Sequence, residues 1–419
     1  MSLGQRIDAA NREAAARICA SRPFWVDVAP LREVVADLGP REITHAGPPI
    51  SFARMCGAQR GAALAAVLFE AWADSPEEAL SLLERGEVTL RPNHHAGGVG
   101  PMAGVCSPSM PVFVVEERAP GPRQGARAYA CLEEPRMNFG AFDAPTLALR
   151  RYWRDSLGPI LAAAVKHRGG LDLGRIIARA LHRGDEMHNR PAAATSLMLG
   201  ELVPAMLRGD FPREDLARAV EFVHDDEIFF LSLSMAASKL AADAARDVAD
   251  STLVVAMARN GTDFGIRVAG CGDQWFTAPS PVVEGLFLTG YGPDDAGRDM
   301  GDSAITETVG LGAFVLPGAM AILEMLGAKS ADALRIGREM QRITVARHPT
   351  YTMPVFDFEG APVGIDVRAV VETGVLPSID TAIAHREAGH PILGAGLTRA
   401  PRQCFVDALV AFAAARGIQ

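Results

Sequence analysis

The chain has 419 residues, a net charge of −9 and a pI near 5.6, and 49% of its residues are hydrophobic while 22% are charged. This composition predicts a globular protein of two or three domains, and it argues against a nucleic-acid partner because phosphate backbones are bound by basic faces. The sequence contains no signal-peptide core, no apolar stretch of membrane-spanning length and no basic run, so we expect a cytoplasmic protein without membrane contacts.

The first part of the chain, residues 1–145, is expected to form an α/β domain. The Ser75-Pro76 dipeptide is a typical helix start, with serine as the cap and proline in the first turn. Residues 87–92 and 112–117 have the pattern of strands.

The loop between these two strands, NHHAGGVGPMAGVCSPSM at 93–110, is rich in glycine. Glycines let the backbone approach a ligand and present N–H groups to an anion, which makes Gly98 and Gly100 candidates for substrate binding. His94 and His95 are further candidates, although neighbouring histidines in a strand face opposite ways, so at most one is expected to point into a site. Neither a GK[ST] ending nor GxGxxG occurs, so no nucleotide is implied. The alternative is a long surface loop with tight turns.

Residues 146–250 are helical in pattern and are expected to form a central helical domain. Between two of its helices lies the polar sequence GDEMHNR, which supplies Asp185, Glu186, His188, Asn189 and Arg190.

The helix that follows this polar sequence opens at Pro191, so its free N–H groups would face the cluster and form an anion site. Polar groups at a buried joint are costly unless they are paired or used. The cluster is therefore either a polar active site or a helix-capping network in which Arg190 pairs with Asp185 or Glu186.

Lys239 is one of only three lysines in the chain, and it follows the apolar run 229–237. It either forms a surface ion pair with Asp243 one helical turn away, or it serves as a point charge for an anionic substrate. The sequence leaves both interpretations open.

Residues 251–419 are expected to form a C-terminal α/β domain. Asn260-Gly261 lies between two apolar runs and predicts a β-hairpin. Asp366 is expected to cap a short helix, and a last helix is expected from about residue 401. The whole pattern predicts a multidomain α+β fold, in which the helical domain lies between two α/β domains with mixed or antiparallel sheets.

A second polar cluster, DMGDSAITET at 299–308, precedes the apolar run 309–323. Hydroxyl groups at a helix N-terminus suit a phosphate or a carboxylate, whereas the acids suit a divalent cation or a general base. Either Asp302 or Ser303 is expected to cap the helix that follows. The candidate site residues here are Asp299, Asp302, Ser303, Thr306, Glu307 and Thr308.

Several long motifs occur in a fixed order: HAGPPI, NHHAGGVGPMAGV, GDEMHNR, MAASK, ARNGTDFGIRVAG, DQWFTAP, DMGDSAITETVGLG and GIDVRAVVETGVLPSIDTAIAH. Together they resemble the YlbE/YahG-like family, long catalogued as a domain of unknown function, over residues 25 to 415. The chain departs from that pattern at Pro191, where family members usually have asparagine.

This resemblance implies a fold with a helical domain between two α/β parts, and a gene neighbourhood with FdrA-type proteins that look like acyl-CoA synthetase subunits. One member is similar in role to a subunit of oxamate carbamoyltransferase. That enzyme of anaerobic allantoin breakdown interconverts oxalurate plus phosphate with oxamate plus carbamoyl phosphate, and it needs three different proteins.

Such a transfer needs donors for a developing oxyanion, a phosphate cradle and a proton shuttle. Arg190 suits the substrate carboxylate, the 97–104 glycines suit the oxyanion, and the helix starts at 191 and 303 suit phosphate. Proton transfer would fall to Asp185, Glu186, His188 or Glu307. The remaining candidates for substrate binding are Asn189, Lys239, Asn260 and Asp273.

Three hypotheses follow. The first is a subunit of a carbamoyltransferase in nitrogen catabolism that takes a small anionic substrate, has an FdrA-like partner and forms a homo-oligomer. The second is a metal-dependent hydrolase or lyase of small amides, with Asp299 and Asp302 as candidate ligands beside Asp185 and His188. The third is a non-catalytic subunit that positions the FdrA-like partner. The cofactor stays open, with a divalent cation as one candidate.

Overall fold

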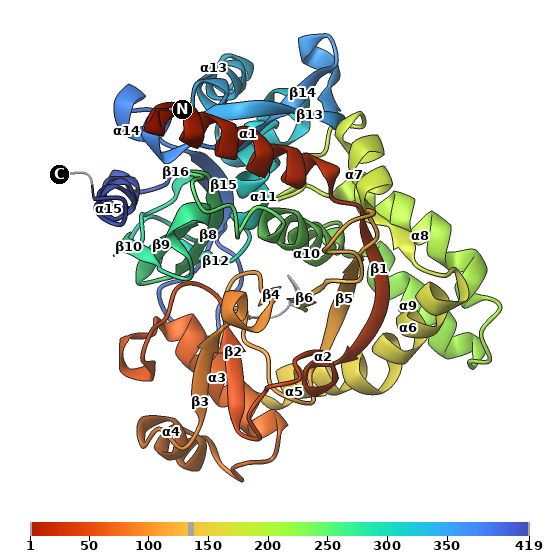
Figure 1. The fold of residues 1–419 in the computed structure, drawn as a ribbon. Helices are drawn as coiled ribbons and strands as arrows, with labels where there is room; N and C mark the ends of the chain where they lie inside the picture. The colour runs from red at the N-terminus through yellow and green to blue at the C-terminus, as the bar shows by residue number, and fades with distance from the viewer. Residues whose placement is uncertain (1, 133–137, 418–419) are drawn as a thin grey trace.

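The computed structural model describes residues 2–132 and 138–417 (Figure 1). It is a mixed α and β structure with several small sheets, as the sequence patterns predicted. Within these residues, no helix combines the length and the apolar character that are needed to cross a membrane. The division of the chain into domains at residues 145 and 250 stays a prediction.

The largest sheet has the strand order β4-β6-β5-β1-β7, and its central pairs are antiparallel. Trp25 of β1 and Phe113 of β5 meet edge to face with ring centroids 5.3 Å apart. The sheet is composed of β1 (Pro23–Pro30), β4 (Gly98–Val99), β5 (Pro111–Glu117), β6 (Arg127–Cys131) and β7 (Leu171–Asp172).

Helices of the central part of the chain cover this sheet (Figure 1). The innermost is α10 (Phe230–Asp243), in which every residue from 232 to 242 is buried. It packs against β5 and β6 on one side and against α1 and α11 on another, which explains its apolar sequence. The other central helices are α5 (Ala144–Tyr152), a π-helical turn (Trp153–Leu157), α6 (Gly158–His167), α7 (Leu173–Leu181), α8 (Ala192–Met206) and α9 (Arg213–His224).

A second hydrophobic core lies below the large sheet, around the parallel pair β2 and β3 (Figure 1). The predicted helix start at Ser75 is confirmed, since the Ser75 side chain accepts a hydrogen bond from the Glu78 backbone N–H at the start of α4. The elements here are α2 (Leu31–Val34), β2 (Glu42–His45), α3 (Gly57–Phe69), α4 (Pro76–Glu84) and β3 (Thr89–Pro92).

The C-terminal part contains antiparallel sheets of four, three and two strands. The predicted Asn260-Gly261 hairpin is confirmed. The four-stranded sheet consists of β8 (Val254–Asn260), β9 (Asp263–Val268), β10 (Phe276–Pro279) and β12 (Met300–Gly301). The smaller sheets consist of β11 (Glu284–Phe287), β15 (Ser378–Ile383) and β16 (Gly394–Arg399), and of β13 (Thr344–Met353) and β14 (Glu359–Ile365).

Helices of the C-terminal part include two that the sequence predicted. Asp366 caps α14 (Val367–Thr373), and α15 (Arg402–Ala414) is the last helix. The others are α11 (Ile305–Thr308), α12 (Leu323–Leu326) and α13 (Ser330–Arg342).

The apolar run 309–323 is not the continuous helix that was expected. After the four residues of α11 the chain forms short 3-10 turns at Gly312–Phe314, Leu316–Gly318 and Met320–Ile322. Gly310 and Gly312 have positive φ angles, which end a right-handed helix. The expected cap is also wrong, because Ala304 occupies the cap position and no side chain bonds there.

The N-terminal helix α1 (Leu3–Ala20) packs on elements from the other end of the chain, including β13, β14 and α10 (Figure 1). Its buried Asn11 donates from Nδ2 to Thr252 Oγ1 at 2.9 Å and to Asp366 Oδ2 at 3.0 Å. The Thr252 backbone N–H donates to Asn11 Oδ1 at 2.8 Å. The two ends of the chain therefore share one buried polar network.

Candidate functional site

The two polar clusters and a strand of the C-terminal part meet at one buried place. His188 lies in the loop between α7 and α8, Glu307 in α11 and Asp380 in β15. The Nδ1 atom of His188 is 2.9 Å from Glu307 Oε1, 3.1 Å from Glu307 Oε2 and 3.8 Å from Asp380 Oδ1. All three side chains are buried. Three segments far apart in the sequence thus place an imidazole against two carboxyl groups.

Asp380 has no ordinary hydrogen-bond partner. In the part of the chain that the structure describes, Asp380 meets no donor with ordinary hydrogen-bond geometry, and its side chain lies within reach of the carboxyl groups of Glu186 and Glu307, with which it can share a proton. Burial, followed by the charge of Glu307, raises the pKa of Asp380 well above its usual value. Burial also raises the pKa of Glu307, to about 7.

The carboxylate of Glu186 fixes the loop that carries His188. Glu186 accepts hydrogen bonds from the backbone N–H of Arg190 and, at 2.7 Å, from that of His188. Met187, between them, has a φ of +79°, which is uncommon for a residue with a side chain. Its carbonyl accepts a hydrogen bond from Ser234 of α10 at 2.8 Å. The tight turn therefore directs the His188 ring toward Glu307.

The predicted anion site at the start of α8 is occupied by a residue of the protein itself. Asp185 accepts hydrogen bonds from the N–H groups of Ala193 at 3.1 Å and Ala194 at 2.8 Å, and it pairs with Arg190 at 3.0 Å. These contacts match the capping network that was the alternative for this cluster. The Arg190 guanidinium is therefore engaged within the protein.

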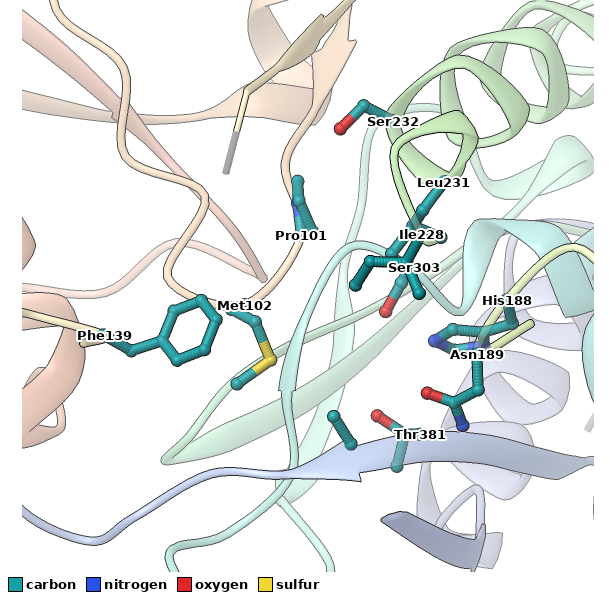
Figure 2. Close-up of a pocket in the computed structure, with 11 residues that line it drawn as sticks. Pro101, Met102, Phe139, His188, Asn189, Ile228, Leu231, Ser232, Ser303 and Thr381 are labelled. Carbon is teal, nitrogen blue, oxygen red and sulfur yellow. The ribbon is translucent and has the colours of Figure 1, made fainter. Parts of the chain in front are cut away.

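His188 lines a small pocket of about 40 Å³ that borders all three segments (Figure 2). Figure 2 shows a ring nitrogen of His188 directed into the pocket, beside Asn189, Ser303 and Thr381. The Nδ2 atom of Asn189 is buried and, among the described residues, has no hydrogen-bond partner. The opposite wall is apolar and is formed by Pro101, Met102 and Phe139.

The polar wall of the pocket is held by Arg259, which is fully buried. Its Nε and Nη2 atoms lie 2.7 and 3.0 Å from the two Asp299 oxygens. It also donates to Ser303 Oγ at 3.3 Å and to Thr381 Oγ1 at 3.0 Å. Both oxygens of Asp299, one of the two candidate metal ligands, thus pair with Arg259.

Asp302 lies in a cradle made by the glycine-rich loop and its neighbours. Its oxygens accept hydrogen bonds from the N–H of Gly47 at 2.8 Å, the N–H of Gly100 at 2.9 Å and the Asn93 amide at 3.2 Å. Burial raises the pKa of Asp302 to about 7, against these hydrogen bonds. The N–H of Gly100, a candidate for binding the substrate oxyanion, thus donates to a carboxyl group of the chain itself.

Gly98 has a packing reason for being glycine. A Cβ there would lie 2.2 Å from the ring of Tyr129. The two histidines of the same loop lie in a 3-10 turn, Asn93–Ala96, and not in a strand, and His94 is buried while His95 is exposed. Both contact Trp275, whose indole N–H donates to His95 Nε2 at 2.8 Å.

Lys239 pairs with Asp243 at 2.6 Å, as one interpretation expected, but Lys239 is buried and only Asp243 is partly exposed. Next to it, Arg267 and Arg246 both pair with the exposed Asp273. Within the described part of the chain, these residues interact with one another and with His94, and this group is separate from His188 and Glu307.

The other polar candidates of the sequence have internal partners. Asn260 accepts from the N–H groups of Thr262 and Asp263 and so shapes the hairpin turn. The Thr306 hydroxyl donates a hydrogen bond to Glu307 Oε2 at 2.9 Å. The Thr308 hydroxyl donates to the Ala304 carbonyl.

Two residues of the site were missed from the sequence. Arg259 directly precedes the hairpin turn and Asp380 stands in an apolar strand, SIDTAI. An unpaired acid within a buried strand is a usable signal, because charged side chains are rarely fully buried without a partner or a role.

The sequence and fold have known relatives. A family model described as oxamate carbamoyltransferase subunit AllG matches residues 88–303. The chain is 42% identical to the oxamate carbamoyltransferase subunit AllG of Escherichia coli (strain K12) over 98% of both chains. It is 40% identical to the uncharacterized protein YahG of the same organism, over 99% of this chain and 88% of that protein.

A solved structure has the same fold. The crystal structure of a conserved protein of unknown function from Enterococcus faecalis V583 superposes with a TM-score of 0.96. The two chains are 42% identical, and the match covers 99% of each.

Proposed function

This chain belongs to the family of the oxamate carbamoyltransferase subunit AllG, and we propose that its pocket beside His188 is where a carbamoyl group moves between phosphate and a small amide such as oxamate. Membership of the YahG-like family, which the sequence motifs predicted, is confirmed by the same matches. The observation that carries the proposal is the pocket itself, where a buried imidazole faces polar groups on one wall and apolar groups on the other.

The proposed transfer forms one bond and breaks another. The amide nitrogen of oxamate attacks the carbamoyl carbon of carbamoyl phosphate, and the bond from that carbon to the phosphate oxygen breaks. The proton of the attacking nitrogen leaves with the departing phosphate. Negative charge develops on the carbamoyl oxygen in between, so the site needs hydrogen-bond donors aimed at that oxygen.

His188 is well suited to be one such donor. Burial, followed by the charge of Arg259, lowers its pKa to about 3, so the ring is neutral at physiological pH. A neutral imidazole can polarise a carbonyl group through its N–H. In this proposal the nitrogen that faces the pocket carries the proton, while Nδ1 faces Glu307.

Two further donors flank His188. The Ser303 hydroxyl accepts a hydrogen bond from Arg259, which leaves its own hydrogen for a ligand. Asn189 contributes the buried Nδ2 that has no partner within the described residues. Met102 and Phe139 would keep water from the reacting carbon, which protects an acyl phosphate from hydrolysis.

Membership of a family of subunits implies a further protein subunit. We propose that this partner is FdrA-like, that the chain also forms a homo-oligomer, and that the complex acts in cytoplasmic nitrogen catabolism, as in allantoin breakdown.

The test is His188→Ala in the complex reconstituted with its partner subunits, assayed for transfer in both directions. Loss of one oxyanion donor is expected to lower kcat by roughly 10²- to 10³-fold. The matched control is His182→Ala, because His182 is exposed and outside the pocket. Full activity of His188→Ala, with the control unchanged, would place the chemistry on another subunit and favour the non-catalytic role.

A further inference from the structure

We propose that His188, Glu307 and Asp380 bind one divalent transition-metal cation, such as Mn²⁺ or Zn²⁺, behind the pocket. Each residue can offer one ligand atom, and these atoms lie within 4.8 Å of one another. The site differs from the metal ligands that the sequence suggested, because Asp299 and Asp302 are engaged elsewhere.

The negative charge of the buried carboxyl groups is not balanced by a basic side chain. Glu186, Glu307 and Asp380 are three fully buried carboxyl groups in one place. Among the described residues, no lysine or arginine forms an ion pair with any of them. The guanidinium of Arg259 forms its ion pair with Asp299. Buried carboxylates without a cation are strongly unfavourable, so this cluster must take up protons or a cation.

Asp380 differs from the two neighbouring carboxyl groups in its hydrogen bonds. Glu186 accepts two backbone N–H groups, and Glu307 accepts from the Thr306 hydroxyl and from the Ala313 N–H at 3.2 Å. Asp380 has no donor with ordinary hydrogen-bond geometry among the described residues, although it is fully buried. Its oxygens face the carboxyl groups of Glu186 and Glu307, and such an arrangement requires either a shared proton or a cation between the groups.

The spacing of the candidate ligand atoms matches the spacing around a bound cation. Two ligands that are each about 2.1 Å from a cation and 90° to 130° apart are separated by roughly 3.0 to 3.8 Å. His188 Nδ1 is 2.9 and 3.1 Å from the Glu307 oxygens and 3.8 Å from Asp380 Oδ1. One imidazole with two carboxylates suits a transition metal, because Mg²⁺ and Ca²⁺ prefer oxygen ligands alone.

The backbone supports this arrangement from the side of Glu307. A Cβ on Gly312 would lie 2.1 Å from Glu307 Oε1, and Gly312 has a φ of +58°. The glycine lets the chain pass directly against the carboxylate and hold it in place. The three ligands also come from a loop, a helix and a strand, so a bound cation would join three elements.

This inference bears on the proposed function at one point, and there it rests on that function. A cation on Nδ1 leaves the ring proton on the other nitrogen, which faces the pocket. His188 would then be a fixed hydrogen-bond donor to the carbamoyl oxygen.

The test uses the full chain, stripped with a chelator and then titrated with Mn²⁺. The wild-type chain is expected to bind about one equivalent, seen as loss of the free-ion electron paramagnetic resonance signal, and to unfold at a higher temperature with the ion. Asp380→Asn and Glu307→Gln are each expected to weaken binding at least tenfold. Asp357→Asn, an acid on an exposed turn, is the matched control and should bind as the wild type does.

The proposal is overturned if the wild-type chain binds less than about a tenth of an equivalent of Mn²⁺ and of Zn²⁺, or if both variants bind as tightly as the wild type. The carboxyl groups would then hold protons in place of a metal. Failure of the metal site would leave the His188→Ala result unaffected, whereas metal binding together with a fully active His188→Ala variant would contradict the proposed function alone.

Discussion

Arg259 and Asp299 form a fully buried pair in which two guanidinium nitrogens face two carboxylate oxygens, at 2.7 and 3.0 Å. The remaining donors of Arg259 reach the Gly301 carbonyl and the hydroxyls of Ser303 and Thr381. One side chain thereby fixes two groups on the wall of the pocket. A lysine could not reproduce this set of contacts, because its ammonium lacks the planar fork.

Asp299→Asn is therefore expected to lower the free energy of unfolding by about 3 to 5 kcal/mol, since it leaves the Arg259 charge buried without its partner. Denaturant unfolding measures this loss. The control is Asp263→Asn, which removes one partner of an ion pair with the exposed Arg54 and should cost about 1 kcal/mol or less. Equal effects of the two substitutions would show that the Arg259 pair contributes no more than a surface pair.

Gly312→Ala is expected to displace Glu307, because the new Cβ would lie 2.1 Å from Glu307 Oε1. Its matched control is Gly374→Ala, where φ is also positive, at +69°, and where, among the described residues other than its sequence neighbours, no atom lies within 4 Å of the added Cβ. The control pays only the backbone strain of about 1 kcal/mol. Gly312→Ala should cost at least about 1 kcal/mol more in denaturant unfolding. A difference near zero would mean that the Glu307 carboxylate shifts freely.

Lys239→Met is expected to destabilise the fold by about 3 kcal/mol, because it leaves Asp243 without its buried partner. Lys166 offers the comparison, since it pairs with Asp27 at the surface and its side chain is 60% exposed. Lys166→Met should cost about 0.5 kcal/mol or less. Thermal and denaturant unfolding of the two variants should therefore separate clearly, and similar losses would contradict the buried position of Lys239.

His348 is expected to make the fold sensitive to acid. Burial lowers its pKa from 6.5 to about 4, and its Nδ1 accepts the N–H groups of Thr350 and Tyr351. The unfolded chain therefore binds a proton at a higher pH than the folded chain does. The stabilising contribution is present above about pH 6.5 and is lost as the pH falls toward 4.

Between pH 7 and pH 5 this contribution should decrease by about 2 kcal/mol. His348→Asn keeps a hydrogen-bond acceptor but cannot titrate in this range, so the stability difference between wild type and variant should shrink over that interval. Denaturant unfolding at several pH values measures it. A difference that does not change with pH would show that His348 titrates alike in the folded and unfolded chains.

Sequence reasoning worked where the signal is local. The Asn260-Gly261 hairpin, the Ser75 cap and the Asp366 cap each depend on a few neighbouring residues, and each was found in the structure. The helix predicted for the apolar run after Glu307 was wrong for a local reason too. The positive φ angles of Gly310 and Gly312 interrupt the helix that the apolar pattern predicts.

The site could be predicted only in part, because its partners are distant in the chain. His188 and Glu307 were both candidates, but their contact across 119 residues carries no local signal. Gly100 and Asp302 are both candidate binding residues by sequence, and they hydrogen-bond to one another across 202 residues. Asp380 and Arg259 were missed because their environment, and not their residue type, makes them unusual.

The hydrogen bond between Asn11 and Asp366 can form only late in the synthesis of the chain. Asn11 leaves the ribosome early, whereas Asp366, 355 residues later, is among the last to be made. At 5 to 20 residues per second, synthesis of the intervening chain takes roughly 20 to 70 s. Throughout that interval α1 lacks the strands β13 and β14 on which it packs. The face of α1 that packs on these two strands therefore stays uncovered by them until translation has almost ended.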